Sequence, residues 1–244
     1  MTPRNKFAFV HLLLSLSIAS TFMALVFFIW YPYPLAKATG VSHIFLMMLS
    51  IDIILGPLMT WFVYKENKKS LKFDLTVIII LQISALFYGI YHIGQGRPAW
   101  LVYSVDRFEL VRNNEIYLEN IHEAKKLYQQ PSWVKPQYVA TQFALNPKQK
   151  KQDMFDEILG GIELSQRPER YVELSKVTDQ IKNRAQSLTL LNQYNDPILV
   201  KETLAKYHQA NSFVPLKANA VDMTVLINKE NGEVIKIVDL RPWK

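Results

Sequence analysis

The chain has 244 residues, of which 50% are hydrophobic and 20% charged, with 8 glycines and no cysteine. This composition excludes disordered, collagen-like and low-complexity proteins, and the missing cysteine excludes disulfide scaffolds, cysteine-ligated metal centres and thiol catalysis. A net charge of +7 would suit nucleic-acid binding, but no basic stripe is interleaved with aromatic residues, so we expect no nucleic-acid partner.

Three long apolar segments in the first 96 residues predict a membrane anchor. About 20 helical residues cross the ~30 Å hydrocarbon core of a bilayer, and the predicted spans cover residues 8–30, 42–64 and 75–94. The first segment is longer than the apolar region of a signal peptide, so we expect it to be retained. The expected organisation is a transmembrane three-helix domain at 1–96 and an aqueous domain at 97–244.

The residues after the first span are typical of a membrane–water interface. Trp30, Tyr31 and Tyr33 are expected to form an aromatic belt. Pro32 and Pro34 are expected to end the helix, because proline has no amide hydrogen to donate.

Lysines predict the orientation of the spans. Cytoplasmic loops are enriched in lysine and arginine, and the N-terminus supplies Arg4 and Lys6. The loop between the second and third spans contains four lysines: Lys65, Lys68, Lys69 and Lys72. We therefore expect a bacterial inner-membrane protein with a cytoplasmic N-terminus and residues 97–244 in the periplasm.

The second span contains one charged residue, Asp52, near its middle. An ionised carboxylate there costs about 2.5–3.5 kcal/mol. Gly56 would let another helix approach closely, and Pro57 is expected to kink the helix. Asp52 either contacts a partner's helix or is a protonated side chain bonded within the bundle. The candidate bonding partners within the bundle are Ser15, Ser17, Ser20, Thr21, Gln82 and Ser84.

Residues 97–244 have the pattern of an α+β domain. Strands are predicted at 100–105, 107–112 and 138–143, with Asn113–Asn114 as a turn. The chain ends in a predicted β-hairpin, whose strands at 222–227 and 234–240 flank the turn signal Asn231–Gly232.

Helices are expected between these strands, weakly at 119–130 and more clearly at 147–160, 175–191 and 196–209. The helix at 147–160 has a capping Asn146, and Gly160–Gly161 should end it. We expect its apolar residues Met154, Phe155, Ile158 and Leu159 to share one face. We expect its acidic residues to pair on the surface with lysines three or four positions away; these are Asp153, Asp156 and Glu157 with Lys148, Lys150 and Lys151.

Motifs of known enzymes are missing from the chain. It has no G-x-S-x-G elbow, Walker loop or H-E-x-x-H pair, and its five histidines have no ligand spacing. We therefore expect no catalytic residue, no cofactor, no metal site and no enzymatic activity.

Several short motifs resemble the TfpX/TfpZ-type type IV pilin accessory proteins. They include Trp30–Pro34, Asp52–Pro57 leading into Lys68–Leu75, Tyr88–Gly89, Arg97–Pro98, Asp106–Phe108 and the terminal Leu240–Trp243. The resemblance implies three N-terminal spans, a periplasmic domain and a role beside the major pilin in pilus assembly or dynamics, as a pilin-specific chaperone. It implies no catalytic residue.

On this resemblance, Asp52, Gly56 and Pro57 are hypothesised to dock the pilin's N-terminal helix, with Asp52 accepting a hydrogen bond or pairing with the pilin's terminal amine. Other pilus-machine components are further candidate partners, besides the lipid bilayer. The alternative functions are a membrane-anchored periplasmic sensor and, with less support, a pilin-modifying membrane enzyme.

The recognised motifs outside the spans also have structural interpretations. Arg97 and Pro98 lie where the third span meets the aqueous domain, where arginine would anchor to lipid headgroups. Asp106 and Arg107 are expected to open the second strand. Arg241 and Trp243 close the hairpin: an Asp106–Arg241 ion pair is one candidate contact, and Trp243 is expected to plug the domain core.

Overall fold

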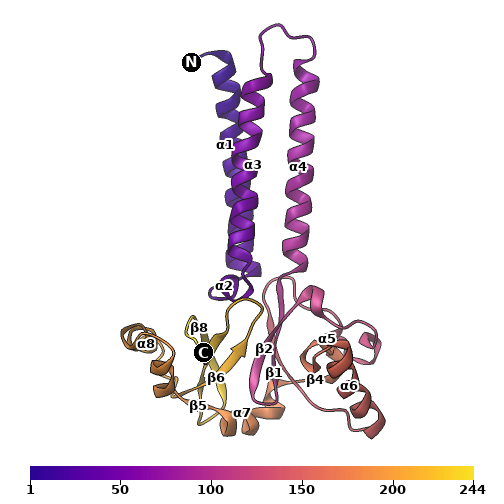
Figure 1. The fold of residues 1–244 in the computed structure, drawn as a ribbon, viewed down its shortest axis with the longest axis vertical. Coiled ribbons are helices and arrows are strands. Elements are labelled where there is room, and N and C mark those ends of the chain that lie inside the picture. Colours follow the sequence, from indigo (N-terminus) through magenta and orange to yellow (C-terminus); the bar gives the residue numbers. More distant parts are fainter.

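A computed structural model describes all residues, 1–244, as a bundle of three long helices standing on an α+β domain (Figure 1). The helices are α1 (Pro3–Ala24), which continues as a π-helical segment to Trp30, α3 (Val41–Val63) and α4 (Leu71–Gln95). All three are long and apolar enough to cross a membrane. Their lipid-side residues are exposed leucine, isoleucine and phenylalanine, as expected where the solvent is hydrocarbon.

The central helix of the bundle is α3, which packs against both α1 and α4. It continues through Pro57 without a break. The buried positions of α3 include Phe45, Leu49 and Gly56. The N-terminus and the lysine-rich loop between α3 and α4 lie together at the end of the bundle farthest from the domain (Figure 1).

A short helix, α2 (Leu35–Thr39), joins the bundle to the domain. Its residues Leu35 and Ala38 are buried in the main core of the domain beside strand residues such as Val225. The Ala38 carbonyl accepts backbone hydrogen bonds from Ala220, at 2.9 Å, and Val221, at 3.1 Å. Part of the segment between the first two membrane helices is therefore built into the aqueous domain.

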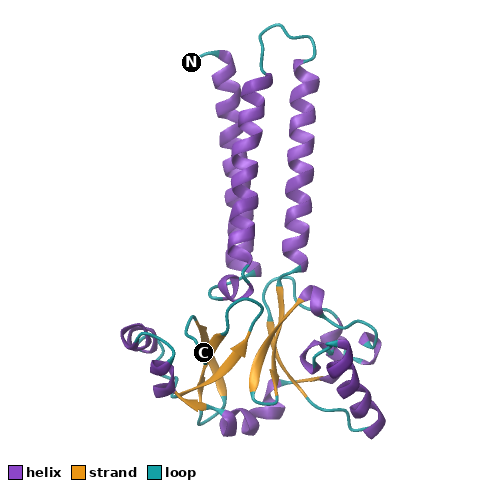
Figure 2. Cartoon of the chain, viewed as in Figure 1, coloured by secondary structure: helices purple, strands orange, loops and turns teal.

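The domain is organised around one mixed sheet (Figure 2). Its strands are β1 (Pro98–Ser104), β2 (Arg107–Arg112), β3 (Gln137–Thr141), β4 (Tyr171–Val172), β5 (Gln186–Ser187), β6 (Ser212–Lys217), β7 (Met223–Asn228) and β8 (Glu233–Val238). They run in the order β4-β3-β1-β2-β6-β7-β8, with β5 also paired to β6. The pairs β1–β3 and β2–β6 are parallel, and the others are antiparallel.

Both faces of the sheet are covered. Leu101 and Tyr103 of β1 point into one core, whereas Trp100 and Val102 point into another, because successive side chains of a strand alternate between faces. Every residue of β1 is buried. The α+β class and the terminal β7–β8 hairpin are as expected from the sequence.

The short helices are α5 (Lys126–Gln129), α6 (Pro147–Gly160), α7 (Thr178–Arg184) and α8 (Pro197–Leu204). The side chain of Asn146 caps α6 by accepting from the Lys148 amide, and Gly161 ends the helix with a positive φ of 66°. Positive φ is easily reached by glycine.

The predicted helix at 175–191 is wrong. Only α7 is α-helical there, and residues 186–187 form β5, which pairs with Ser212 and Phe213 of β6. Pairing with a distant strand has overridden a helical pattern that was locally reasonable. The helix expected at 196–209 ends at Leu204, and the weak one at 119–130 is reduced to α5 and a 3₁₀ turn.

A groove in the helix bundle as candidate functional site

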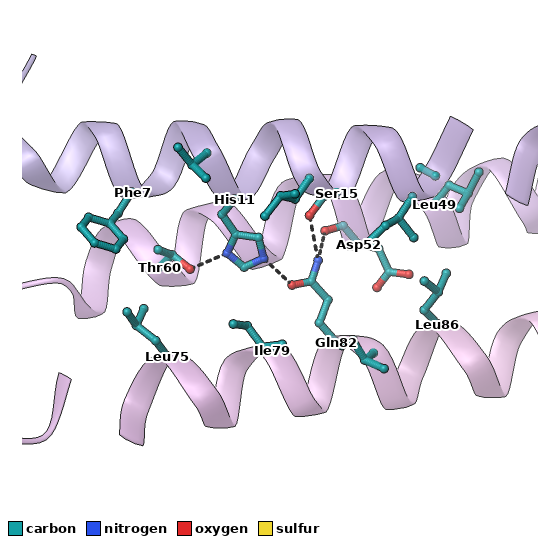
Figure 3. Close-up of a pocket in the computed structure, with 15 residues that line it drawn as sticks. Phe7, His11, Ser15, Leu49, Asp52, Thr60, Leu75, Ile79, Gln82 and Leu86 are labelled. Atoms are coloured by element: carbon teal, nitrogen blue, oxygen red, sulfur yellow. Dashed lines mark hydrogen bonds between the residues drawn. The ribbon is translucent and has the colours of Figure 1, made fainter. Parts of the chain in front are cut away.

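A pocket of about 300 Å³ lies between α1 and α4, with α3 as its floor (Figure 3). Its walls are mostly apolar, with Leu14, Ile79 and Leu86 among the side chains that line it. Five polar residues interrupt this surface: His11, Ser15, Asp52, Thr60 and Gln82. Such side chains are costly in hydrocarbon unless they find partners, so their hydrogen bonds define the chemistry of the site.

Four of the polar residues form a hydrogen-bond chain that joins the three helices. Thr60 Oγ1 lies 2.7 Å from His11 Nδ1, and His11 Nε2 lies 2.9 Å from Gln82 Oε1. Because an amide oxygen only accepts, a proton on Nε2 fits this chain, with the Thr60 hydroxyl donating to Nδ1. Gln82 Nε2 donates to Ser15 Oγ, at 3.3 Å, and to the Asp52 backbone carbonyl, at 2.7 Å.

Gly56 makes room for this chain. A Cβ atom at Gly56 would overlap Gln82 Oε1, far inside contact distance. The close approach expected at Gly56 therefore takes place, and the neighbour is the Gln82 side chain of α4. Gly56 and Pro57 are both buried within the bundle.

The carboxylate of Asp52 is not part of this hydrogen-bond chain. Its Oδ2 is buried and has no hydrogen-bond partner, and Figure 3 shows the carboxylate near Leu86, away from the dashed bonds. None of the six side chains considered as bonding partners reaches it. Gln82 does bond Asp52, but the atom of Asp52 that it bonds is the backbone carbonyl oxygen. The interpretation of Asp52 as a side chain bonded within the bundle is wrong in this conformation. An acceptor without a donor therefore lines the groove.

The expected aromatic belt is only partly formed. Tyr33 is exposed, but Tyr31 is buried and donates its hydroxyl to the Ile93 carbonyl at 2.7 Å. Trp30 packs against Gly94, where a Cβ would lie 3.1 Å from the indole. Gly94 leaves space for the indole, so these two aromatic residues face α4 instead of the interface. Pro32 and Pro34 lie in the turn between α1 and α2, as expected for residues that end a helix.

Arg97 is buried, which excludes headgroup anchoring. Its Nη1 donates to the Gly94 carbonyl at 2.8 Å, and its guanidinium lies 4.4 Å from the centre of the Trp133 ring. Burial lowers the pKa of Arg97 below its usual value. Arg97 thus caps the C-terminal end of α4, where cations interact favourably with the helix dipole. Pro98 follows as the first residue of β1.

The remaining motif residues make contacts within the domain. Arg107 begins β2 and pairs with Glu109 at 3.0 Å, and Asp106 lies in the preceding turn. Arg241 bonds the Asp222 carbonyl and Asp239, so the candidate Asp106–Arg241 pair does not form.

Trp243 is partly buried and donates to Asp222 Oδ2 at 2.7 Å, so it fastens the C-terminus to the residue before β7 instead of plugging the core. Among the loop lysines, Lys68 pairs with Asp74 at 2.8 Å, while Lys65 and Lys69 are exposed in the loop and Lys72 is exposed at the start of α4.

Sequence reasoning missed His11 and Thr60, and it considered Gln82 only as a candidate partner of Asp52. Each lies in a mostly apolar span among other polar residues, and the signal that would have found them is their matching depth in the bundle. No group of three or more histidine, aspartate or glutamate side chains is placed to hold a metal ion.

Comparison with known proteins identifies the family. The family model for fimbrial assembly protein FimB matches residues 1–40. The chain is 32% identical over 247 aligned residues to the fimbrial assembly protein of serogroup I of Dichelobacter nodosus, covering 96% of this chain and 94% of that protein. It is 31% identical to the serogroup E1 protein over the same shares of both chains.

A third relative is the D. nodosus fimbrial assembly protein of serogroups C1 and C2, which is 36% identical over 122 residues, 49% of this chain and 92% of that protein. No solved structure is significantly similar to the chain. With a relative above 30% identity along nearly its whole length, this chain belongs to the fimbrial assembly protein family.

Proposed function

We propose that the protein is an inner-membrane assembly factor of the TfpX/TfpZ type that binds the major pilin of type IV pili. Its N-terminus and the lysine-rich loop face the cytoplasm, and its α+β domain lies in the periplasm. Membership of the fimbrial assembly family and three helices of membrane-spanning length support this role. Four lysines in one loop support the orientation, by the positive-inside rule.

The observation that carries the proposal is the groove with its unpartnered carboxylate. Asp52 Oδ2 is buried without a donor beside an apolar surface between α1 and α4. In hydrocarbon, a polar group gains most from a donor that another helix supplies. The N-terminal helix of a pilin before assembly fits this chemistry, because it is apolar and its terminal amine is both a cation and a donor.

The role is non-enzymatic and resembles that of a chaperone. The helix bundle binds the membrane helix of the pilin, and the periplasmic domain contacts the pilin's aqueous head. The groove offers shape, apolar contact and one acceptor. The Thr60 hydroxyl does bond the His11 imidazole, but the other ring nitrogen bonds the Gln82 amide instead of a carboxylate, so we assign this pair to holding the helices together.

The test is the substitution Asp52→Asn in the full-length protein. The variant keeps the backbone carbonyl that Gln82 bonds, so the bundle should stay intact while the carboxylate charge is lost. We expect copurification of pilin with the tagged protein to fall about tenfold or more, because losing one partner of a buried charge pair costs at least ~2 kcal/mol. Piliation should fall with it.

The matched control is Asp74→Asn, which removes a carboxylate paired with Lys68 outside the groove. This variant should copurify pilin as the wild type does. Unchanged pilin capture and piliation with Asp52→Asn would contradict the proposal. So would equal losses in the two variants.

A further inference from the structure

Helix α6 packs on the domain with its acidic side facing inward. Its one buried residue is Asp153, which accepts two bonds from Arg170, at 2.7 and 3.0 Å. Asp156 pairs with Arg167 at 2.6 Å. Arg167 is itself only 1% exposed, so the underside of α6 is an ion-pair network. Asp153 and Asp156, which were expected to pair with lysines on the helix surface, instead hold the helix to the domain, whereas Glu157 is exposed and forms no ion pair.

The outer face of α6 is apolar. Met154, Phe155, Ile158 and Leu159 share this face, and they are between 49% and 79% exposed. Phe143 and the fully exposed Leu145 precede the helix in the chain and are exposed as well. A group of large apolar side chains that shares one face and packs on nothing is typical of an interaction surface.

Positive charge borders this apolar patch. With 3.6 residues per helical turn, Lys148 and Lys151 lie on the same side of α6 as Met154 and Phe155. Neither lysine forms an ion pair. Lys151 Nζ lies 5.8 Å from the centre of the Phe155 ring. A complementary surface would be apolar and would carry carboxylates at one edge.

We propose that the outer face of α6 binds the aqueous head of the pilin, at a surface where apolar side chains adjoin acidic ones. This inference rests on the proposed function. A pilin whose membrane helix occupies the groove is tethered beside the domain, at an effective concentration that reaches about the millimolar range for short flexible tethers. A modest second contact is then sufficient to orient the head.

A protein surface suits this face better than a lipid surface does. Figure 1 places α6 on the flank of the domain, away from the ends of the three membrane helices. In this position α6 does not adjoin the end of the bundle that meets the domain. The ion pairs beneath α6 also fix its orientation, so the patch is a preformed platform.

The experiment measures binding of the purified pilin head, lacking its membrane helix, to the full-length protein in nanodiscs of neutral lipid. The double variant Ile158→Ser/Leu159→Ser removes the centre of the patch. Its matched control is Ile198→Ser/Leu199→Ser, which changes the same exposed pair of residue types on α8. We expect affinity for the head to fall about tenfold or more in the first variant and to be unchanged in the second.

Charge is tested with Lys151→Glu, with Lys229→Glu in the exposed β7–β8 turn as control. Lys151→Glu should weaken binding of the head, mainly through slower association at low salt. Undetectable binding of the head, or binding that neither the α6 double variant nor Lys151→Glu weakens, would overturn the inference. Binding of α6 to anionic phospholipid vesicles in place of the head would also overturn it.

Asp52→Asn distinguishes a failure of this inference from a failure of the proposed function. The variant should weaken capture of intact pilin and leave binding of the isolated head unchanged. If the head binds as expected while Asp52→Asn has no effect on intact pilin, the groove proposal fails and the α6 proposal stands. The reverse pattern would leave the groove proposal standing and overturn the α6 proposal.

Discussion

Arg167 is the most heavily engaged charged residue in the domain. It pairs with Asp153, Asp156 and Glu169 and lies 4.7 Å from the centre of the Tyr117 ring. Desolvating so many charges is unfavourable by itself, and it is offset only if every carboxylate keeps its cation. The arginine is therefore needed for the stability of the segment that carries α6.

Replacing Arg167 with methionine should reduce the free energy of unfolding by about 3–5 kcal/mol, because buried carboxylates lose their counter-ion. Chemical denaturation of the full-length protein, followed by tryptophan fluorescence, measures the change. Arg184→Met is the control, since Arg184 is exposed, and it should change stability by less than about 0.5 kcal/mol. Similar losses in both variants would contradict this role of Arg167.

Glu109 should make the domain sensitive to pH. Burial, with Glu163 nearby, raises the pKa of its carboxyl above 4.5, although Arg107 bonds it. The folded state then holds more protons than the unfolded state at pH values between 4.5 and the raised pKa. The contribution of Glu109 to stability therefore falls as pH rises through this window.

The measurement compares the wild type with Glu109→Gln, whose side chain is neutral throughout. Unfolding free energies taken from about pH 4 to about pH 7 should show the wild type losing stability relative to the variant as pH rises. A wild type that gains stability relative to Glu109→Gln over this range would mean that the Arg107 ion pair outweighs burial.

Among the elements, the three membrane helices depend on one another through a few polar contacts. Helices in lipid gain little from apolar contact alone, so bonds between them and close packing at small residues are important. The chain from Thr60 through His11 to Gln82 supplies the bonds, and Gly56 supplies the space. The groove keeps its shape because these contacts fix α4 against α3.

Gly56→Ala should loosen the bundle. The new methyl group would displace the Gln82 amide and break its bonds to His11, Ser15 and the Asp52 carbonyl, at a cost of about 1–2 kcal/mol. Unfolding in detergent measures the loss. In the double variant Gly56→Ala/Gln82→Ala, the added loss from the alanine at 56 should nearly vanish. Additive losses would show that the two residues do not interact.

For helix α6, the limits predicted from the sequence are right, but the expected orientation of the helix on the domain is wrong. Its caps at Asn146 and Gly161 are local, and they were predicted correctly. Which face turns inward depends on Arg167 and Arg170, which follow the helix in the chain and lie beneath it in the fold. The apolar residues share one face as expected, but that face is exposed.

At the scale of the whole molecule, the bundle and the domain are joined through several contacts. α4 leads directly into β1, and α2 carries Leu35 and Ala38 into the core of the domain. Lys37 also pairs with Asp239 at 2.7 Å. These contacts join the bundle to the domain without a flexible linker. A change in the spacing of the membrane helices is therefore expected to be transmitted to the sheet.

Leu35→Ala tests this connection. Leu35 lies next to the membrane helices in the chain, yet its loss should destabilise the aqueous domain by about 2–5 kcal/mol, as for other buried leucines. Leu13→Ala, at a half-exposed position in α1, should leave the domain unaffected. Hydrogen exchange of the sheet amides in detergent measures both, and equal protection in both variants would contradict the connection.

The sequence by itself determined the three apolar helices, the α+β class and the terminal hairpin. Each depends on a pattern within one short segment: length of apolar run, alternation, or a turn such as Asn231–Gly232. It also singled out Asp52, because a charged side chain is conspicuous in an apolar span.

Only the tertiary structure decided what these features face. His11 lies 49 positions from Thr60 and 71 from Gln82, and no local pattern reveals that the three helices bring them together. The same holds for β5, which pairs across the sheet, and for the inward carboxylates of α6. Partners of a side chain are set by long-range packing, so the groove and the exposed apolar face of α6 emerge only when the chain is folded.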